Sequence, residues 1–301
     1  MASSAHPSHL IERSAPWLFV FLWSTGYVAV KACVQYAPPF KLLLWRGGLS
    51  ALVFLALALV CRVRFPSPRG MAQALLAGLL MQTLFLGGCF YAMSRGLPAA
   101  VTALITGLQP VLTALYVSTA QRQRLGGQAW LGIAVGFAGV YLVLAPGLQP
   151  GGLDGWAIMA ACIALLAVTT GTLYQKQLPA DGHVFASAFF QYVAVSVIMA
   201  LVCLFDDSAP VQWQATFVFG LLWMVLGVSV SAVLLLIYLI RRGEATRVAT
   251  YFYLVPVVTA LLGWLLFGNV LTSTTLAGMA LAVLGMLLVL RPAARAVQAA
   301  P

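Results

Sequence analysis

Charged side chains are scarce in this sequence. Only 7% of the 301 residues are charged, and only six of them are acidic. Soluble globular domains carry about 25% charged residues, so this scarcity excludes a soluble enzyme or a soluble nucleic-acid-binding domain. Apolar residues take their place, since 62% of the chain is hydrophobic and the mean hydropathy is +1.00. The composition indicates a polytopic membrane protein.

Several chemical groupings are also missing. The five cysteines are isolated in apolar runs without metal-ligand or disulfide spacing, so we expect them to pack, with no metal and no cofactor. None of the six acidic residues and three histidines falls deep in an apolar run. The membrane-embedded carboxylate or histidine of many proton-coupled carriers is therefore absent, as is the residue cluster that an intramembrane enzyme needs. Residues 1–14 are polar and show no signal-peptide pattern.

Apolar runs long enough to cross the ~30 Å hydrocarbon core follow one another along the chain. Because only helices and closed barrels satisfy their backbone in lipid, runs of this length predict an all-α fold. The separators are short and rich in proline and glycine, which leaves no room for a soluble domain. We predict ten transmembrane helices, over residues 16–37, 41–61, 71–94, 98–119, 127–145, 154–175, 184–205, 216–240, 246–267 and 272–290.

Lysine and arginine are distributed unevenly between the two sides that these helices define. Twelve lie on the side of both termini, and four lie on the other side: Lys31, Lys41, Arg46 and Arg95. Cytoplasmic loops retain positive charge, so we predict a multi-pass protein of a bacterial-type inner (plasma) membrane with both termini cytoplasmic. The net charge of +10 then reports orientation in the lipid bilayer, and no nucleic-acid partner is expected.

The sequence repeats itself at a spacing of about 146 residues. Residues 108–115 (LQPVLTAL) return as 254–261 (LVPVVTAL). Five spans in each copy is an odd number, so the second copy enters the membrane upside down, as in inverted-topology transporters. The expected domains are an N-terminal tail (1–14), a first repeat (15–146), a second repeat (147–291) and a C-terminal tail (292–301). Further pairs are Gly132 with Gly278, Gly139 with Gly285, Lys31 with Lys176, and Thr25 with Thr170.

Each copy of the repeated stretch places a proline inside an apolar run. Proline has no N–H, so Pro110 frees the carbonyl of Thr106 and Pro256 frees that of Phe252. A freed acceptor at membrane depth is tolerated where protein or water satisfies it. We therefore predict helix breaks at both prolines beside a central cavity, with Thr106 and Phe252 in contact with substrate.

These features resemble the EamA family of the drug/metabolite transporter superfamily. The resemblance rests on the LWSTGY stretch (22–27), on Pro39, Phe40 and Arg46, and on the proline-bearing fourth and ninth helices in two halves of five. It covers residues 15–291 and implies a basket-like bundle around a central cavity that exports small metabolites such as amino acids by alternating access. Other classes that remain open are an exchanger of phosphorylated metabolites, a channel and a non-transporting structural protein.

Arg46 is the sharpest candidate for a substrate contact. It lies about 9 Å inside the second helix, at 1.5 Å per residue, and its repeat partner is the neutral Gln191. A charge at that depth faces a cavity or a partner, and a guanidinium suits a carboxylate or phosphate. We predict an anion contact. The competing interpretation is local pairing, or a side chain that reaches outward to the interface.

Other polar and aromatic residues complete the predicted substrate site. Each of them could instead serve helix packing, interhelical hydrogen bonding or the interfacial aromatic belt. Lys31 and Lys176, at opposite membrane faces in the inverted copies, are predicted gates, with interfacial anchoring as the alternative. The spacing of Gly132 and Gly136 suits a tight helix pair or a homodimer seam. The remaining site residues are Trp23, Thr25, Gln82, Tyr91, Gln109, Thr170 and Tyr251.

Overall fold

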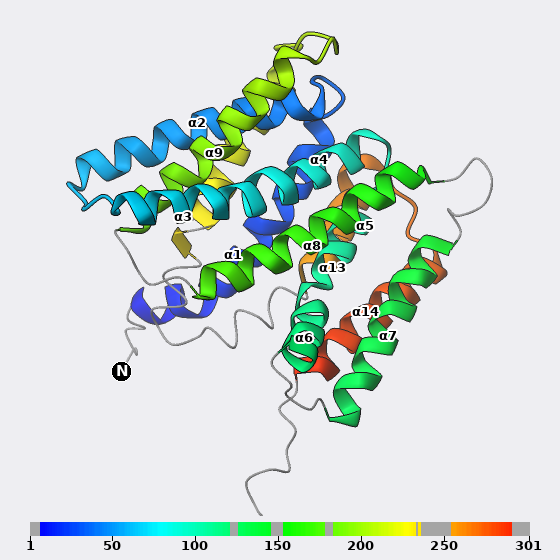
Figure 1. Cartoon of the computed structure of the whole chain (residues 1–301). Coiled ribbons are helices and arrows are strands. Elements are labelled where there is room, and N and C mark those ends of the chain that lie inside the picture. Colours follow the sequence, from blue (N-terminus) through cyan, green and yellow to red (C-terminus); the bar gives the residue numbers. More distant parts are fainter. Residues whose placement is uncertain are drawn as a thin grey trace, which may run out of the picture.

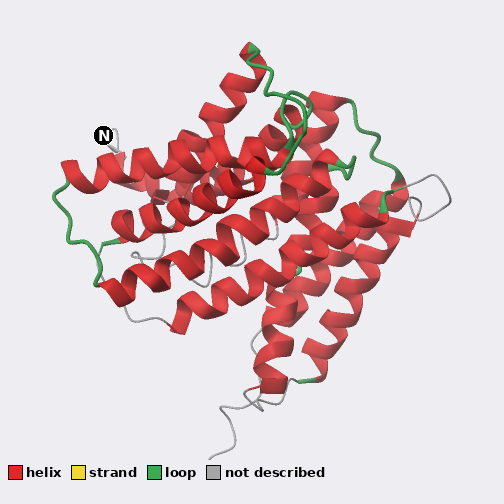
Figure 2. Cartoon of the chain, turned by 45° about the horizontal axis from the view of Figure 1, so that its top comes forward, coloured by secondary structure: helices red, strands yellow, loops and turns green. Residues whose placement is uncertain are grey.

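The computed structural model describes residues 7–120, 126–145, 153–177, 183–232, 234–235 and 254–290. All regular structure within these ranges is helical (Figures 1 and 2). The elements are α1 (Pro7–Cys33), α2 (Pro39–Val60), α3 (Pro68–Gly78), η1 (Leu79–Leu84), α4 (Phe85–Ser94), α5 (Ala99–Gly107), α6 (Gln109–Ala120), α7 (Gly127–Leu144), α8 (Gly155–Gln177), α9 (Val184–Leu204), α10 (Ala215–Leu222), η3 (Trp223–Ala232), α13 (Leu254–Phe267) and α14 (Ser273–Leu290).

Seven helical stretches within the described ranges are long and apolar enough to cross a membrane. They are Pro39–Val60, Pro68–Ser94, Ala99–Ala120, Gly127–Leu144, Gly155–Gln177, Val184–Leu204 and Ala215–Ala232. The prediction of an all-helical, polytopic membrane protein is thereby confirmed. The other expected spans correspond, in their described parts, to α1, α13 and α14. The count of ten stays a prediction.

Local signals set several helix ends. The Ser67 hydroxyl accepts a hydrogen bond from the Gly70 N–H (3.2 Å) and caps α3, which begins with a proline that needs no N–H partner. At the end of α4, Gly96 takes a positive φ of 96°. The Leu97 N–H then bonds to the Ala92 carbonyl (3.0 Å), a turn that glycine adopts without steric cost.

Two segments depart from α-helical geometry at corresponding places. The π-helical η1 lies between α3 and α4, and the π-helical η3 continues α10. A shift of 146 residues carries 79–84 onto 225–230, inside η3. Short π-helical turns widen the helix locally and often mark functional positions.

The pair α7 and α14 stands side by side at one flank of the bundle (Figure 1). A Cβ on Gly132 would lie 2.7 Å from the Gly285 carbonyl oxygen, and one on Gly139 would lie 2.6 Å from the Gly278 carbonyl oxygen. Absent side chains therefore let the two backbones touch. The tight helix pair predicted from the glycine spacing is confirmed. The helix that packs against the glycines of α7 is α14 of the same chain.

The remaining helices pack into the main body of the bundle. There α2 lies against α9, α4 against α8, and α1 against α13 and η3. Loops at one end are tied together: the Gln212 N–H donates to the Tyr36 carbonyl (2.8 Å), and Lys41 Nζ donates to the Ser208 carbonyl (2.6 Å). At the loop that follows α2, the His183 N–H donates to the Arg64 carbonyl (3.1 Å).

The Asp154 carboxylate should make thermal stability weakly pH-dependent. It accepts the Trp156 N–H (2.9 Å) and the Arg95 Nε–H (2.5 Å), and these bonds lower the pKa of Asp154 below its usual value. A lowered folded-state pKa contributes stability above the unfolded value of about 3.9, and that contribution is lost as pH falls through the folded value. We expect Asp154→Asn to flatten the dependence of Tm on pH between about pH 5 and 2. Because Arg95 is exposed and Asp154 is only half-buried, the change should be small; an unchanged pH profile would contradict it.

Candidate functional site

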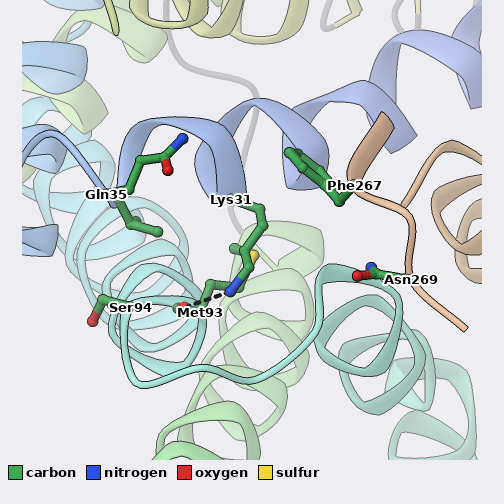
Figure 3. Close-up of a pocket in the computed structure, with 7 residues that line it drawn as sticks. Lys31, Gln35, Met93, Ser94, Phe267 and Asn269 are labelled. Carbon is green, nitrogen blue, oxygen red and sulfur yellow. Dashed lines mark hydrogen bonds between the residues drawn. The ribbon is translucent and has the colours of Figure 1, made fainter. Parts of the chain in front are cut away.

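A pocket of about 370 Å³ opens where α1, α4 and α13 end (Figure 3). Its lining comes from both halves of the sequence: Lys31, Val34, Gln35, Met93 and Ser94 from the first, and Phe267 and Asn269 from the second. We call it the outer pocket, because the predicted topology places this end of the bundle on the exterior side. Its volume lies within the 300–1,000 Å³ typical of small-molecule sites.

Lys31 is the only charged side chain among the described residues that line the outer pocket. It lies in the last turn of α1, where a cation interacts favourably with the helix dipole. Its Nζ is 3.4 Å from the Met93 carbonyl oxygen, beyond the usual 2.7–3.2 Å for N–H···O bonds. The ammonium therefore keeps donors for an anion. The predicted gate residue lies at a pocket mouth, in keeping with either a gating or a binding role.

Asn269 is brought to this pocket by the turn that ends α13. Gly268 takes a positive φ of 64°, so the chain reverses after Phe267. The Asn269 amide then lies back against α13, with Nδ2 3.0 Å from where a Cβ on Gly263 would sit. The amide supplies a neutral donor and acceptor opposite Lys31 (Figure 3).

Arg46 lies inside the bundle and is only 5% exposed. Its Nε and Nη2 each donate to the Ser229 hydroxyl at 3.3 Å, which ties α2 to η3. The guanidinium carbon is 5.6 Å from the centre of the Phe90 ring. No ion pair to Arg46 occurs within the described residues. Among the described residues this cation thus has a hydroxyl and an aromatic partner but no counter-charge.

Thr106 belongs to a chain of hydroxyls between α1 and α5. It donates to the Thr102 carbonyl (2.8 Å), and its oxygen lies 2.9 Å from the Tyr27 hydroxyl. One turn away on α1, the Ser24 hydroxyl donates to the Val255 carbonyl of α13 (3.3 Å). This polar contact reaches the residue directly before Pro256 and joins the two halves.

The break expected at Pro110 is present. Helix α5 ends at Gly107 and α6 begins at Gln109, with Leu108 in the turn between them. The cap N–H, that of Leu108, donates to the Ile105 carbonyl (3.1 Å) and is shared with the Thr106 carbonyl. Pro256 lies in the first described turn of α13, and Tyr251 and Phe252 lie outside the described residues.

The other predicted residues do not gather in one place. Gln109 donates to the Thr172 hydroxyl (2.8 Å), which joins α6 to α8. The Tyr91 ring stacks on Phe40 with 6.1 Å between ring centres, which joins α4 to α2. Trp23 packs beside Phe19. The Thr25 hydroxyl accepts the Trp223 indole N–H (2.9 Å) on the bundle flank. Gln82 lies in η1, and Thr170 and Lys176 are exposed on α8. These roles remain predictions.

Several residues of the site escaped the sequence reasoning. Gln35 and Asn269 supply the amides of the outer pocket, Phe267 forms one wall, and Ser229 is the partner of Arg46. Only Gln35 had a usable signal, because it follows Lys31 by four residues, in the turn directly after α1. Three buried hydroxyls have no partner among the described residues: Ser50, Thr83 and Thr259.

Comparison with known proteins agrees with this architecture. The family model of the EamA-like transporter family matches residues 17–145 and 155–291. The chain is 27% identical to the "Uncharacterized transporter YvbV" of Bacillus subtilis (strain 168), over 90% of this chain and 88% of the relative. It is 23% identical to the "Uncharacterized inner membrane transporter YedA" of Escherichia coli (strain K12), over 89% and 87%.

A third relative carries a more specific name. The "Probable amino-acid metabolite efflux pump" of Escherichia coli (strain K12) is 25% identical, over 89% of this chain and 91% of that protein. A solved crystal structure superposes with a TM-score of 0.63 at 19% identity, covering 91% of this chain and 94% of the other, which shows a shared fold. The family model alone covers most of the sequence. The chain belongs to the EamA-like transporter family.

Proposed function

We propose that the protein exports a small metabolite, with amino acids and related compounds as the expected class, by alternating access between two inverted five-helix halves. The observation that carries this proposal is the outer pocket, which is lined by both halves and contains an unpaired cation within its described lining. The name of the efflux-pump relative supports the choice of substrate class.

The helix contacts support the inverted repeat. The shift of 146 residues carries Gly132 to Gly278 and Gly139 to Gly285, so it exchanges the contact between Gly132 and Gly285 with the contact between Gly278 and Gly139. The two π-helical segments correspond in the same way. A two-fold relation of this kind is the arrangement used by transporters that alternate around a midplane site.

The inverted repeat also predicts a second conformation of the transporter. Lys31 and Lys176 are equivalent in the repeat but lie at opposite ends of the bundle. A pocket equivalent to the outer pocket would open around Lys176 when the outer one closes. The hydroxyl of Thr83, buried without a partner among the described residues, would then meet substrate along the path between the halves. In the proposed orientation, with both termini cytoplasmic, the outer pocket faces the cell exterior.

Counterflow into proteoliposomes tests the proposed function. The wild-type protein should concentrate at least one labelled amino acid when the vesicles are preloaded with the unlabelled compound, and protein-free vesicles should not. Because no acidic side chain lies within the seven described stretches that are long and apolar enough to cross a membrane, counterflow should persist when an ionophore collapses the pH gradient. Counterflow of phosphorylated sugars but of no amino acid would establish the exchanger instead, and dependence on the pH gradient would refute the uncoupled mechanism.

A further inference from the structure

Two hollows meet at Phe267. One is the outer pocket, which is lined on this side by Lys31 of α1 and by Val34 and Gln35 of the turn that follows. The other is a groove of about 530 Å³ on the flank of the bundle, which we call the lateral groove. It is lined by Thr25, Val28, Ala29, Ala32, Phe219, Gly220, Trp223, Leu266 and Phe267. The two hollows therefore use neighbouring faces of α1 and share the Phe267 side chain.

The outer pocket suits an anionic head group. The half-buried Lys31 has only a long contact to a carbonyl, and no carboxylate occurs among the described lining residues. The Gln35 amide nitrogen donates to the Ala32 carbonyl (3.0 Å), which leaves its oxygen and one N–H available. A carboxylate would find charge and donors here. A protonated amine would find no counter-charge.

The lateral groove suits an apolar tail. Its lining includes three small residues, Ala29, Ala32 and Gly220, which leave room for a ligand. The large apolar side chains of Phe219 and Leu266 also line it. The hydroxyl of Thr25 is already bonded to Trp223 and to the Leu22 carbonyl. Phe219 is 74% exposed and Leu266 is 60% exposed on the apolar flank of the bundle, where the groove would open to hydrocarbon.

Phe267 forms the boundary between the two hollows. It is the last residue of α13 and precedes the positive-φ turn at Gly268. Its side chain is 38% exposed. Figure 3 shows Phe267 at the end of α13 and Asn269 on the loop that follows it, with Lys31 reaching the pocket from α1. A rotation of this ring would join the polar pocket to the apolar groove.

We propose that the outer pocket and the lateral groove together bind a single-tailed amphipathic carboxylate, with its head at Lys31 and its tail passing Phe267 into the groove. This inference rests on the proposed export function. Within its class of amino acids and related compounds, it favours the related compounds that keep the carboxylate and lack a free ammonium. Each hollow has the volume of a small-molecule site, which favours a single-tailed solute over a two-chained phospholipid.

Binding to the full-length protein in phosphatidylcholine nanodiscs tests the head group without requiring transport. Three probes each carry a phenyl ring and differ in the head group: 3-phenylpropanoate, phenylalanine and phenethylamine. Calorimetric titration should show the carboxylate binding at least about tenfold more tightly than the zwitterion, with no binding of the amine. Lys31→Gln should weaken the carboxylate about tenfold, as expected for a lost charge-assisted hydrogen bond, and Lys31→Arg should restore it. Equal affinities for the three probes would overturn the inference and leave a positive counterflow result standing.

A second arm tests the tail. Dodecanoate carrying a terminal diazirine should label α1 between Val28 and Ala32 or η3 near Trp223. Phe219→Trp, which fills the groove, should weaken dodecanoate about tenfold and leave propanoate unchanged. Phe267→Ala should strengthen dodecanoate relative to 3-phenylpropanoate, and Leu266→Ala, which leaves the boundary ring in place, should not. Labelling spread evenly over the lipid-facing helices, or displacement of dodecanoate by phosphatidylglycerol at equal concentration, would contradict the proposal.

Discussion

Replacing Gly285 by alanine is expected to destabilise the transporter by about 1–3 kcal/mol, and replacement by leucine is expected to abolish folding. A Cβ at this position would overlap the backbone of Gly136 and lie 2.6 Å from the Gly132 carbonyl oxygen. Backbone atoms cannot rotate away as a side chain can, so α14 would have to move off α7. Since α7 and α14 make most of their contacts with each other, separating them leaves little to hold either helix.

The same seam supplies the control. A Cβ on Gly136 would meet only the Leu108 and Val111 side chains and the Gly285 Cα, at 3.7–4.0 Å, which is ordinary contact. Gly136→Ala should therefore leave Tm within a few degrees of wild type, although Gly136 lies in the same seam. Thermal unfolding and the monodisperse fraction in size-exclusion chromatography check both variants. Equal Tm values for Gly285→Ala and Gly136→Ala would show that the seam is looser than the backbone distances indicate.

The helices could be predicted because the length of an apolar run is read directly along the sequence. Apolar runs of about twenty residues must become helices in lipid, so α2, α8 and α9 lie within a few residues of the expected spans. The glycine seam was also visible, because small residues at matching spacing in two helices are meaningful wherever the helices lie. The break at Pro110 followed from the missing N–H.

Contacts between helices were harder to predict from the sequence, because they depend on which face each helix turns toward its neighbour. Thr25 and Thr170 are equivalent in the repeat, yet Thr25 bonds to Trp223 while Thr170 is exposed and bonds within α8. The π-helical turns of η3 also shift its register, so the approach of Ser229 to Arg46 could not be read from α-helical spacing. Asn269 reaches the outer pocket through a positive-φ turn that the sequence marks only with a glycine.

Replacing Arg46 by methionine is expected to reduce counterflow by about 10- to 100-fold, the value of a charge-assisted contact, while Tm stays at or above that of wild type. A buried charge without a counter-charge costs free energy, and an apolar side chain of similar volume removes that cost. Against this gain, the buried Ser229 hydroxyl loses its donor, at about 1–3 kcal/mol for a buried group left unpaired. The two effects should nearly cancel.

A double-mutant cycle separates the two roles of Arg46. If the bond to Ser229 holds α2 against η3 as a structural link, Arg46→Met and Ser229→Ala should each lower Tm, and their coupling energy should reach about 1–3 kcal/mol. If Arg46 instead serves the transported anion, Ser229→Ala should leave counterflow close to wild type, and Arg46→Lys should retain more counterflow than Arg46→Met. A parallel loss of Tm and counterflow in Arg46→Met would refute the anion contact. Because Arg46 lies on the first half and Ser229 on the second, their bond joins two surfaces that would separate under the proposed alternating access. We therefore expect it to break when the halves part and substrate enters.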